Sequence, residues 1–224
     1  AATVVHERAQ AVERTGGGFR IRFADGSMEC AQLVLACEAH NAAKLAAPLD
    51  ARLADLLASV PYSSSMTVAL AFPDTAFPRP LAGFGFLVPQ CERRRLVACT
   101  SVGIKFSHRA PAGTTLFRCF LGGMDGAGVL SESDDAIVQA VLDELHEIVG
   151  FTAPPSLTRI FRWPRSMAQY TVGHARRLAE IEARAAAIPG LQLAGNAYTG
   201  IGIPDCIRMG KHAAGSIAKA TCPV

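Results

Sequence analysis

The sequence predicts a mixed α/β (α+β) protein in which part of the chain forms an antiparallel sheet. Between residues 65 and 121, short segments that alternate apolar and polar residues follow one another at regular spacing, with turn-rich segments between them. Outside this region, the continuous apolar runs 32–36 and 191–194 are typical of strands that are covered on both faces. A chain of 224 residues is long enough to bury a substantial core.

The first part of the chain combines strands and helices. Val4-Val5 suggests a short strand, and residues 19–23 alternate with period two. Asp25-Gly26 follows as a hairpin turn signal. Residues 38–58 are rich in alanine and leucine, which predicts helix with an interruption at Pro48.

The middle of the chain is predicted to be a meander followed by a helix. Strands are expected at 65–72, 84–88, 95–101 and 114–121. Ser133 is a good N-cap for an amphipathic helix that ends at Gly150, and a further strand is expected at 156–163.

The last part returns to helices and one strand. We expect a helix over 175–187, a strand at 191–194, and a glycine-rich connection over 195–202. A final helix is expected from Pro204 to Lys219, because proline suits the first helical position.

Composition excludes several classes of protein. The net charge is +3 and the basic residues are scattered, unlike a nucleic-acid-binding surface. The seven cysteines are odd in number and none has C-x-x-C spacing, which argues against a zinc site or a disulfide framework. Free thiols favour a reducing, cytoplasmic compartment. No run of 18 apolar residues indicates a transmembrane helix, and the six histidines lack metal-ligand spacing.

The segment 193–205 carries the strongest chemical signal. Gly195, Gly200 and Gly202 allow backbone to approach a flat ligand closely. The free amides of the helix that follows point towards negative charge, such as the N1–O2 edge of a reduced flavin. An ordinary helix start after a tight loop is the alternative interpretation.

Five segments together resemble a known family. They are Gly195-Asn196-Ala197-Tyr198-Thr199-Gly200-Ile201-Gly202-Ile203-Pro204-Asp205-Cys206-Ile207-Arg208, Gly83-Phe84-Gly85-Phe86-Leu87-Val88-Pro89, Phe120-Leu121-Gly122-Gly123, Gln169-Tyr170-Thr171-Val172-Gly173-His174, and residues 32–43. In their order along the chain they resemble the protoporphyrinogen oxidase family of the FAD-dependent amine oxidase superfamily, over its C-terminal half only. Ala168 and Glu38 stand where the family usually has proline.

The resemblance implies oxidation of protoporphyrinogen IX to protoporphyrin IX by FAD, with oxygen as acceptor, in haem biosynthesis. It places six residues at the cofactor and three at the porphyrinogen. The cofactor-binding residues implied are Ala9, Trp163, Asn196, Ile201, Gly202 and Ile203. The substrate-binding residues implied are Phe84, Gly85 and Leu87. Neither a metal site nor a catalytic acid or base is assigned.

The resemblance also implies a division of the chain. Residues 1–55 would be the middle segment of an FAD-binding three-layer domain, residues 56–175 the second segment of an antiparallel-sheet substrate domain, and residues 176–224 the C-terminal FAD-binding segment. The sequence contains no G-x-G-x-x-G motif, so we expect the N-terminal Rossmann segment to be missing. The chain alone is then expected to be inactive and to purify without FAD.

Three other functions remain open at this point. The same family could oxidise coproporphyrinogen III to coproporphyrin III; the chain could be part of a related flavoenzyme such as a carotenoid desaturase; or it could be a non-enzymatic module that binds a porphyrin or a partner. Beside the porphyrinogen substrate, the partners expected are a peripheral membrane contact and self-association through exposed apolar surface, with no nucleic acid.

Overall fold

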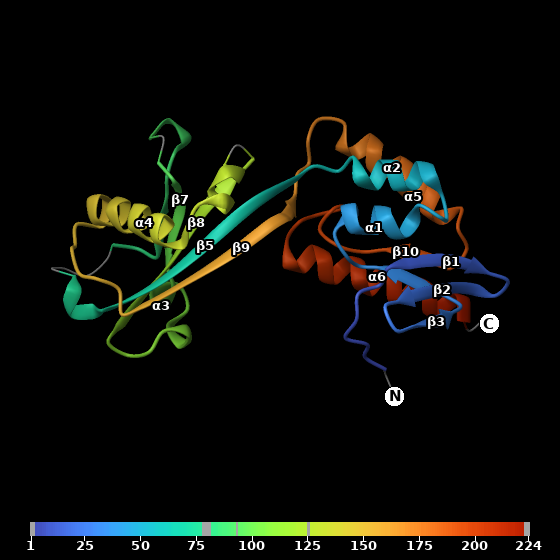
Figure 1. Ribbon diagram of the computed structural model, residues 1–224, viewed down its shortest axis with the longest axis horizontal. Helices are drawn as coiled ribbons and strands as arrows, with labels where there is room; N and C mark the ends of the chain where they lie inside the picture. Colours follow the sequence, from blue (N-terminus) through green and yellow to red (C-terminus); the bar gives the residue numbers. More distant parts are fainter. Residues whose placement is uncertain (1–2, 78–81, 93, 125, 222–224) are drawn as a thin grey trace. The chain divides into compact units, whose positions relative to one another are not determined.

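The computed structural model describes residues 3–77, 82–92, 94–124 and 126–221 (Figure 1). These residues form two compact units. Unit 1 consists of residues 1–61 and 167–224, and unit 2 consists of residues 62–166. Unit 2 is therefore inserted between two segments of unit 1. Each unit is described by itself below.

Unit 1 contains two small sheets and four helices. Its elements are β1 (Ala11–Thr15), β2 (Gly18–Phe23), β3 (Gly26–Cys30), β4 (Leu33–Leu35), α1 (Ala39–Ala46), α2 (Ala51–Ala58), α5 (His174–Ala186), β10 (Leu191–Leu193) and α6 (Ile203–Thr221). β1, β2 and β3 form an antiparallel sheet, and β10 pairs in parallel with β4 although 155 residues separate Leu35 from Leu191. α2 packs against both α1 and α5.

Unit 2 is built on one antiparallel sheet with the strand order β6-β7-β8-β5-β9. Its strands are β5 (Tyr62–Pro73), β6 (Gly85–Leu87), β7 (Leu96–Ser101), β8 (Thr114–Gly123) and β9 (Leu157–Ala168). Its α-helices are α3 (Val102–Lys105) and α4 (Asp134–Val149). Short 3₁₀ helices occupy Asp74–Ala76, Gln90–Glu92, Ser107–Arg109 and Ala127–Ser131.

One face of the sheet in unit 2 is covered by α4 (Figure 1). Along β5, the side chains of Met66, Val68, Leu70 and Phe72 are fully buried, whereas those between them are less so. They pack with residues of β7 and β8 and with the buried stripe of α4, which is Ile137, Val141 and Leu145. Alternate side chains of the strand thus pack against one stripe of the α-helix in a single core.

Most of the predicted elements are confirmed. The hairpin at Asp25-Gly26 joins β2 and β3, and the helical region 38–58 is divided around Pro48 into α1 and α2. Ser133 caps α4 by accepting a hydrogen bond from the amide of Ala136, and Gly150 ends that helix in the left-handed conformation. The strand suggested at Val4-Val5 is wrong, because the first strand begins at Ala11.

The domain boundaries predicted at 55/56 and 175/176 differ from the borders of the two units, which fall at 61/62 and 166/167. The first predicted boundary lies inside α2 and the second lies inside α5. Which unit binds cofactor and which binds substrate stays a prediction.

Asp50 ties the start of α2 to α5 within unit 1. Its carboxylate accepts a hydrogen bond from the amide of Leu53 (2.8 Å) and one from Nη1 of Arg184 (2.9 Å). The Leu53 amide, and after it the Arg184 guanidinium, hold the pKa of Asp50 below its usual value. A carboxyl group whose pKa is lowered on folding stabilises the protein above its unfolded-state pKa, and this contribution is lost as the pH falls through the folded-state value.

Asp50→Ala should lower the free energy of unfolding by about 1–2 kcal/mol at neutral pH, because a helix N-cap and an ion pair are lost together. Asp50→Asn should cost less, since asparagine also caps helices. The difference between wild type and Asp50→Ala should shrink below about pH 4, where the carboxylate takes up a proton. Urea unfolding at several pH values measures this.

Asp55→Ala is the matched control, since Asp55 is an exposed residue of the same helix and does not cap it. Its effect should stay within about 0.5 kcal/mol. Equal destabilisation by the Asp50 and Asp55 variants would contradict the capping role.

Candidate functional site

Tyr170 holds the glycine-rich loop between β10 and α6. Its hydroxyl donates to the carbonyl oxygen of Asn196 (3.0 Å) and accepts from the amide of Gly200 (2.8 Å). Burial raises the pKa of Tyr170, so the hydroxyl keeps the proton that it donates. One side chain therefore fixes both halves of the loop.

His174 supports the same loop from the start of α5. Its ring stacks on that of Tyr170, with centroids 4.0 Å apart and an interplanar angle of 10°. Its Nε2 lies 3.0 Å from the carbonyl oxygen of Tyr198. His174 is buried and acts here as a positioning residue for the loop.

The end of the loop forms an apolar surface beside the start of α6. Ile201, Ile203 and Ile207 are all exposed. Asp205, in the first turn, accepts a hydrogen bond from the Gly202 amide. Gly200 has φ +142°, and a Cβ there would lie 2.4 Å from Cγ of Asp205, so only glycine fits.

This arrangement fits a flavin ring in part. Exposed isoleucine side chains suit a flat apolar ring, and the partial positive charge of the α6 N-terminus suits its anionic edge. The sequence contains no G-x-G-x-x-G motif, the strand–turn–helix signature that binds the pyrophosphate in dinucleotide-binding folds.

Ala9 is far from this loop in the sequence and lines a cavity of unit 1. It is half-buried, and the cavity of about 620 Å³ is also lined by residues of α1, among them Asn41 and Lys44, and by Cys37 just before it. The polar and basic groups there suit the adenosine part of a dinucleotide.

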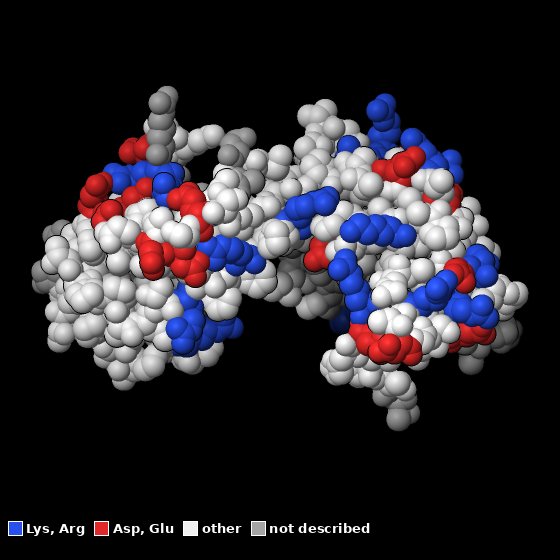
Figure 2. All heavy atoms as spheres, viewed as in Figure 1, with Lys and Arg blue, Asp and Glu red and all other residues white. Residues whose placement is uncertain are grey.

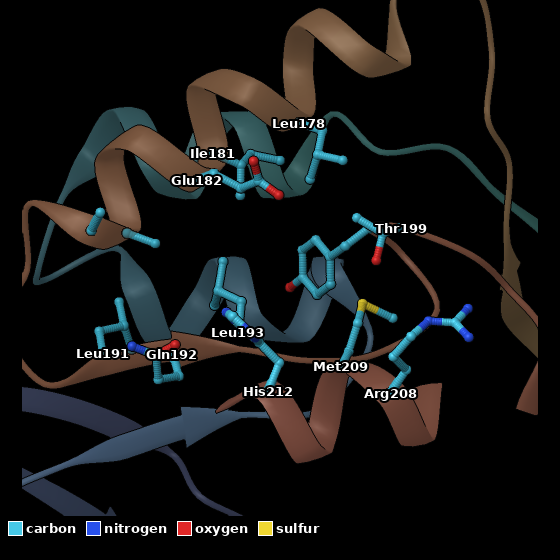
Figure 3. Close-up of a pocket in the computed structure, with 13 residues that line it drawn as sticks. Leu178, Ile181, Glu182, Leu191, Gln192, Leu193, Thr199, Arg208, Met209 and His212 are labelled. Atoms are coloured by element: carbon cyan, nitrogen blue, oxygen red, sulfur yellow. The ribbon is translucent and has the colours of Figure 1, made fainter. Parts of the chain in front are cut away.

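A second cavity of unit 1 was not expected from the sequence. A cavity of about 580 Å³ lies between α5 and α6, beside β10 (Figure 3). Leu178 and Ile181 of α5 face Met209 and His212 of α6 across it. Among the described residues β10 pairs only with β4, and Leu191, Gln192 and Leu193 of β10 line this cavity.

The second face of the sheet in unit 2 carries a continuous row of side chains. Strand pairing places Leu87, Ala98, Phe120 and Thr67 opposite one another on β6, β7, β8 and β5. The residue after each of them, Val88, Cys99, Leu121 or Val68, belongs to the core or packs against it. Since side chains alternate along a strand, the row lies on the face opposite α4.

Trp163 extends this row onto β9. Its Nε1 donates to Oγ1 of Thr67 (3.2 Å), and its ring stacks with that of Phe161 at 6.3 Å. Both aromatic rings are about half exposed. We call the row Leu87, Ala98, Phe120, Thr67 and Trp163 the platform.

Gly85 is the first residue of β6 and lies next to the platform. Its φ is +153°, and a Cβ at this position would lie 2.2 Å from the carbonyl oxygen of Cys99. Phe86 packs against the core, whereas Phe84, two residues earlier, is 58% exposed with Nζ of Lys105 5.3 Å from its ring centroid. Phe84, which lies just before β6, is thus exposed although Phe86 packs against the core.

The structure brings the predicted site residues together in two groups. Asn196, Ile201, Gly202 and Ile203 share one loop and helix start in unit 1, and Ala9 lines a cavity in the same unit. Phe84, Gly85, Leu87 and Trp163 lie in unit 2. Trp163, assigned to the cofactor from the sequence, thus belongs to the same sheet face as Leu87. The roles of all nine residues stay predictions.

The described part of the chain has neither a metal-binding cluster nor a membrane-spanning helix. Among the described residues, no group of three histidine, cysteine, aspartate or glutamate side chains is placed to hold a metal ion. None of the helices in the described ranges has the length and hydropathy needed to cross a membrane.

Tyr170→Phe should loosen the loop 195–202 while keeping the ring stacked on His174. The loss of two hydrogen bonds at a partly exposed site should lower the free energy of unfolding by about 1 kcal/mol. Amide hydrogen exchange should quicken at Gly200. Val172→Ala, which truncates a fully exposed side chain in the same segment, is the control; unchanged exchange in Tyr170→Phe would contradict the anchoring role.

Curated relatives resemble this chain in sequence. It is 38% identical over 152 residues to the coproporphyrinogen III oxidase of Bacillus subtilis strain 168, covering 67% of this chain and 32% of that protein. It is 35% identical over 190 residues to the coproporphyrinogen III oxidase of Propionibacterium freudenreichii, covering 84% of this chain and 35% of the relative. The chain spans less than half the length of these relatives.

Solved structures agree in fold. A protein of Exiguobacterium sp. 255-15, described as a candidate protoporphyrinogen oxidase, superposes with a TM-score of 0.84 at 31% identity over 94% of this chain and 46% of the other. Cyclohexylamine oxidase from Brevibacterium oxydans superposes with a TM-score of 0.76 over 97% of this chain and 49% of that one, at 16% identity, which supports the fold alone. Residues 4–218 match the protein family described as flavin containing amine oxidoreductase, and the chain belongs to this family.

Proposed function

We propose that the whole protein containing this chain oxidises coproporphyrinogen III to coproporphyrin III with FAD and oxygen. The observation that carries this proposal is the platform, an open apolar sheet face in a chain that belongs to a flavin-dependent family. The names of the relatives in Bacillus and Propionibacterium support the substrate.

The platform suits a porphyrinogen for physical reasons. Large flat rings bury much apolar area against aromatic and aliphatic side chains without needing polar partners. Phe120 and Trp163 supply rings, and Ala98 and Thr67 are small enough to let a ligand lie close to the sheet. Leu87, which is 81% exposed, and Phe84 would pack at its edge, next to Gly85.

We assign the cofactor to unit 1 and the substrate to unit 2. The chemistry that FAD supplies when bound is the acceptance of electrons from the macrocycle and their transfer to oxygen. Ile201 and Ile203 would pack against the flavin ring, the backbone of Asn196 and Gly202 would lie along it, and Ala9 would meet the adenine. Trp163 would shield the reacting rings from water.

Protoporphyrinogen IX is the second candidate substrate. The description of the Exiguobacterium protein favours it, since that protein superposes well over nearly the whole chain. Steady-state assays of the whole protein with each porphyrinogen, following porphyrin fluorescence, distinguish the two. Turnover of neither substrate would reject the enzymatic proposal in favour of a porphyrin- or partner-binding module.

The 224-residue chain alone should bind FAD only at micromolar concentrations or more weakly. Tight flavoproteins bind at about nanomolar Kd, and several kcal/mol of that come from a pyrophosphate site that this sequence lacks. The expected result is a colourless purified protein, with flavin absorbance retained only when FAD is in excess. Stoichiometric flavin after gel filtration would contradict it.

Phe84→Ala and Leu87→Ala should weaken porphyrinogen turnover in the whole protein while leaving its flavin content unchanged. Each substitution removes apolar contact worth about 1.5–3 kcal/mol if fully buried by substrate, or roughly tenfold to a hundredfold in kcat/KM. Ile148→Ala, in the last turn of α4, is the matched control, because Ile148 is partly exposed and belongs to the helix that covers the other face of the sheet. Unchanged kinetics in both variants would remove these residues from the substrate site.

A further inference from the structure

We infer that Arg118 binds a propionate group of the substrate and favours porphyrinogens that carry propionate beside the platform. This inference rests on the proposed function and names a residue that sets its substrate preference. It starts from the strand register, which determines what surrounds Arg118.

Arg118 lies on β8 two residues before Phe120, so both side chains project from the open face. The residues on either side of Arg118, Phe117 and Cys119, are buried in the core with exposed fractions of 3% and 0%. Arg118 itself is exposed. A charged side chain therefore stands on a sheet face whose neighbouring row is otherwise uncharged.

The cross-strand partners of Arg118 leave room around it. Pairing places it between Thr100 of β7 and Ala69 of β5. On the far side of Thr100, its partner on β6 is Gly85. None of these side chains is large or charged. Arg118 thus belongs to a row parallel to the platform and about 7 Å from it, the length of two residues in a strand.

The guanidinium group lies over the sheet. Its Cζ is 4.9 Å from the ring centroid of Phe120, within the range of a cation–π contact. A flat ligand on the platform would contact Phe120, and its edge would then meet the guanidinium. The planar fork of arginine matches a carboxylate with two parallel hydrogen bonds.

Arg118 forms no ion pair with any carboxylate in the part of the chain that the structure describes. Residues 96–124 contain neither aspartate nor glutamate, so the surrounding strands offer no competing anion. Lys105 and Arg109 lie in this segment too, against the rings of Phe84 and Phe106, and they add to its positive charge. Figure 2 shows lysine and arginine side chains gathered at the end of unit 2 that holds α3.

The two candidate substrates differ in the groups that Arg118 would contact. Coproporphyrinogen III carries propionates at two positions where protoporphyrinogen IX carries vinyl groups. A guanidinium that faces one of these positions forms a charge-assisted hydrogen bond with the propionate of coproporphyrinogen III. Against the vinyl group of protoporphyrinogen IX it loses its hydration and gains no hydrogen bond in return. Arg118 would therefore favour the substrate with more propionates.

The test uses the 224-residue chain and its one tryptophan. Because Trp163 belongs to the platform, a porphyrin bound there should quench its fluorescence by energy transfer. Coproporphyrin III and protoporphyrin IX, the stable oxidised products, serve as probes at low protein concentration and at two salt concentrations.

Arg118→Gln should weaken coproporphyrin III binding about tenfold and protoporphyrin IX binding much less, and the salt dependence of coproporphyrin III binding should decrease. Arg118→Lys should recover part of the affinity, since it keeps the charge but not the fork. Arg94→Gln, which removes the same charge from unit 2 at an ion pair with Glu147 of α4, should bind both porphyrins like wild type.

Equal binding of coproporphyrin III by wild type and Arg118→Gln would overturn the role of Arg118 and leave the platform as the porphyrin site. Quenching of the wild type by neither porphyrin would instead reject the proposed substrate face, and Arg118 with it. Far-ultraviolet circular dichroism of each variant separates loss of binding from loss of fold.

Discussion

Among the described residues of unit 2, α4 covers one face of the sheet and leaves the row from Leu87 to Trp163 on the other, and the other features of this unit depend on that constraint. Alternation along β5 and β8 sends Val68, Leu70 and Cys119 towards α4 and sends Thr67 and Phe120 the other way. Antiparallel sheets often leave one face to water, and that face is then polar. Here it carries a leucine, a phenylalanine and a tryptophan, so this face is suited to an apolar ligand.

Unit 1 is organised by a different constraint. The parallel pair β10 and β4 is short, and the loop that leaves β10 is kept in place by Tyr170 and His174 instead of by strand pairing. The loop can therefore present glycine backbone and exposed isoleucines at the start of α6 while its interior stays fixed. An apolar helix start whose loop is held by hydrogen bonds suits the flavin contact that we propose.

The sequence was sufficient to predict most of the elements, because each depends on local patterns: period-two alternation in β2, Ser133 and Gly150 at the ends of α4, and the break at Pro48. Strand alignment across the sheet depends on pairing between distant segments, so the platform and the place of Arg118 beside it were not visible. The cavity beside β10 was missed for the same reason, since α5, β10 and α6 become neighbours only after folding. Trp163 was noticed through family resemblance, but its place beside Thr67 required the structure.

The central claim is that the open face of unit 2 binds a porphyrin ring, and methyl NMR of the chain titrated with coproporphyrin III tests it most directly. A porphyrin ring current shifts the signals of nearby methyl groups strongly. Signals of Leu87, Ala98 and Thr67 should shift, whereas those of Ile137, Val141 and Leu145, which pack on the opposite face, should stay in place. Shifts confined to the methyl groups of α4, or no shifts at saturating porphyrin, would contradict the account.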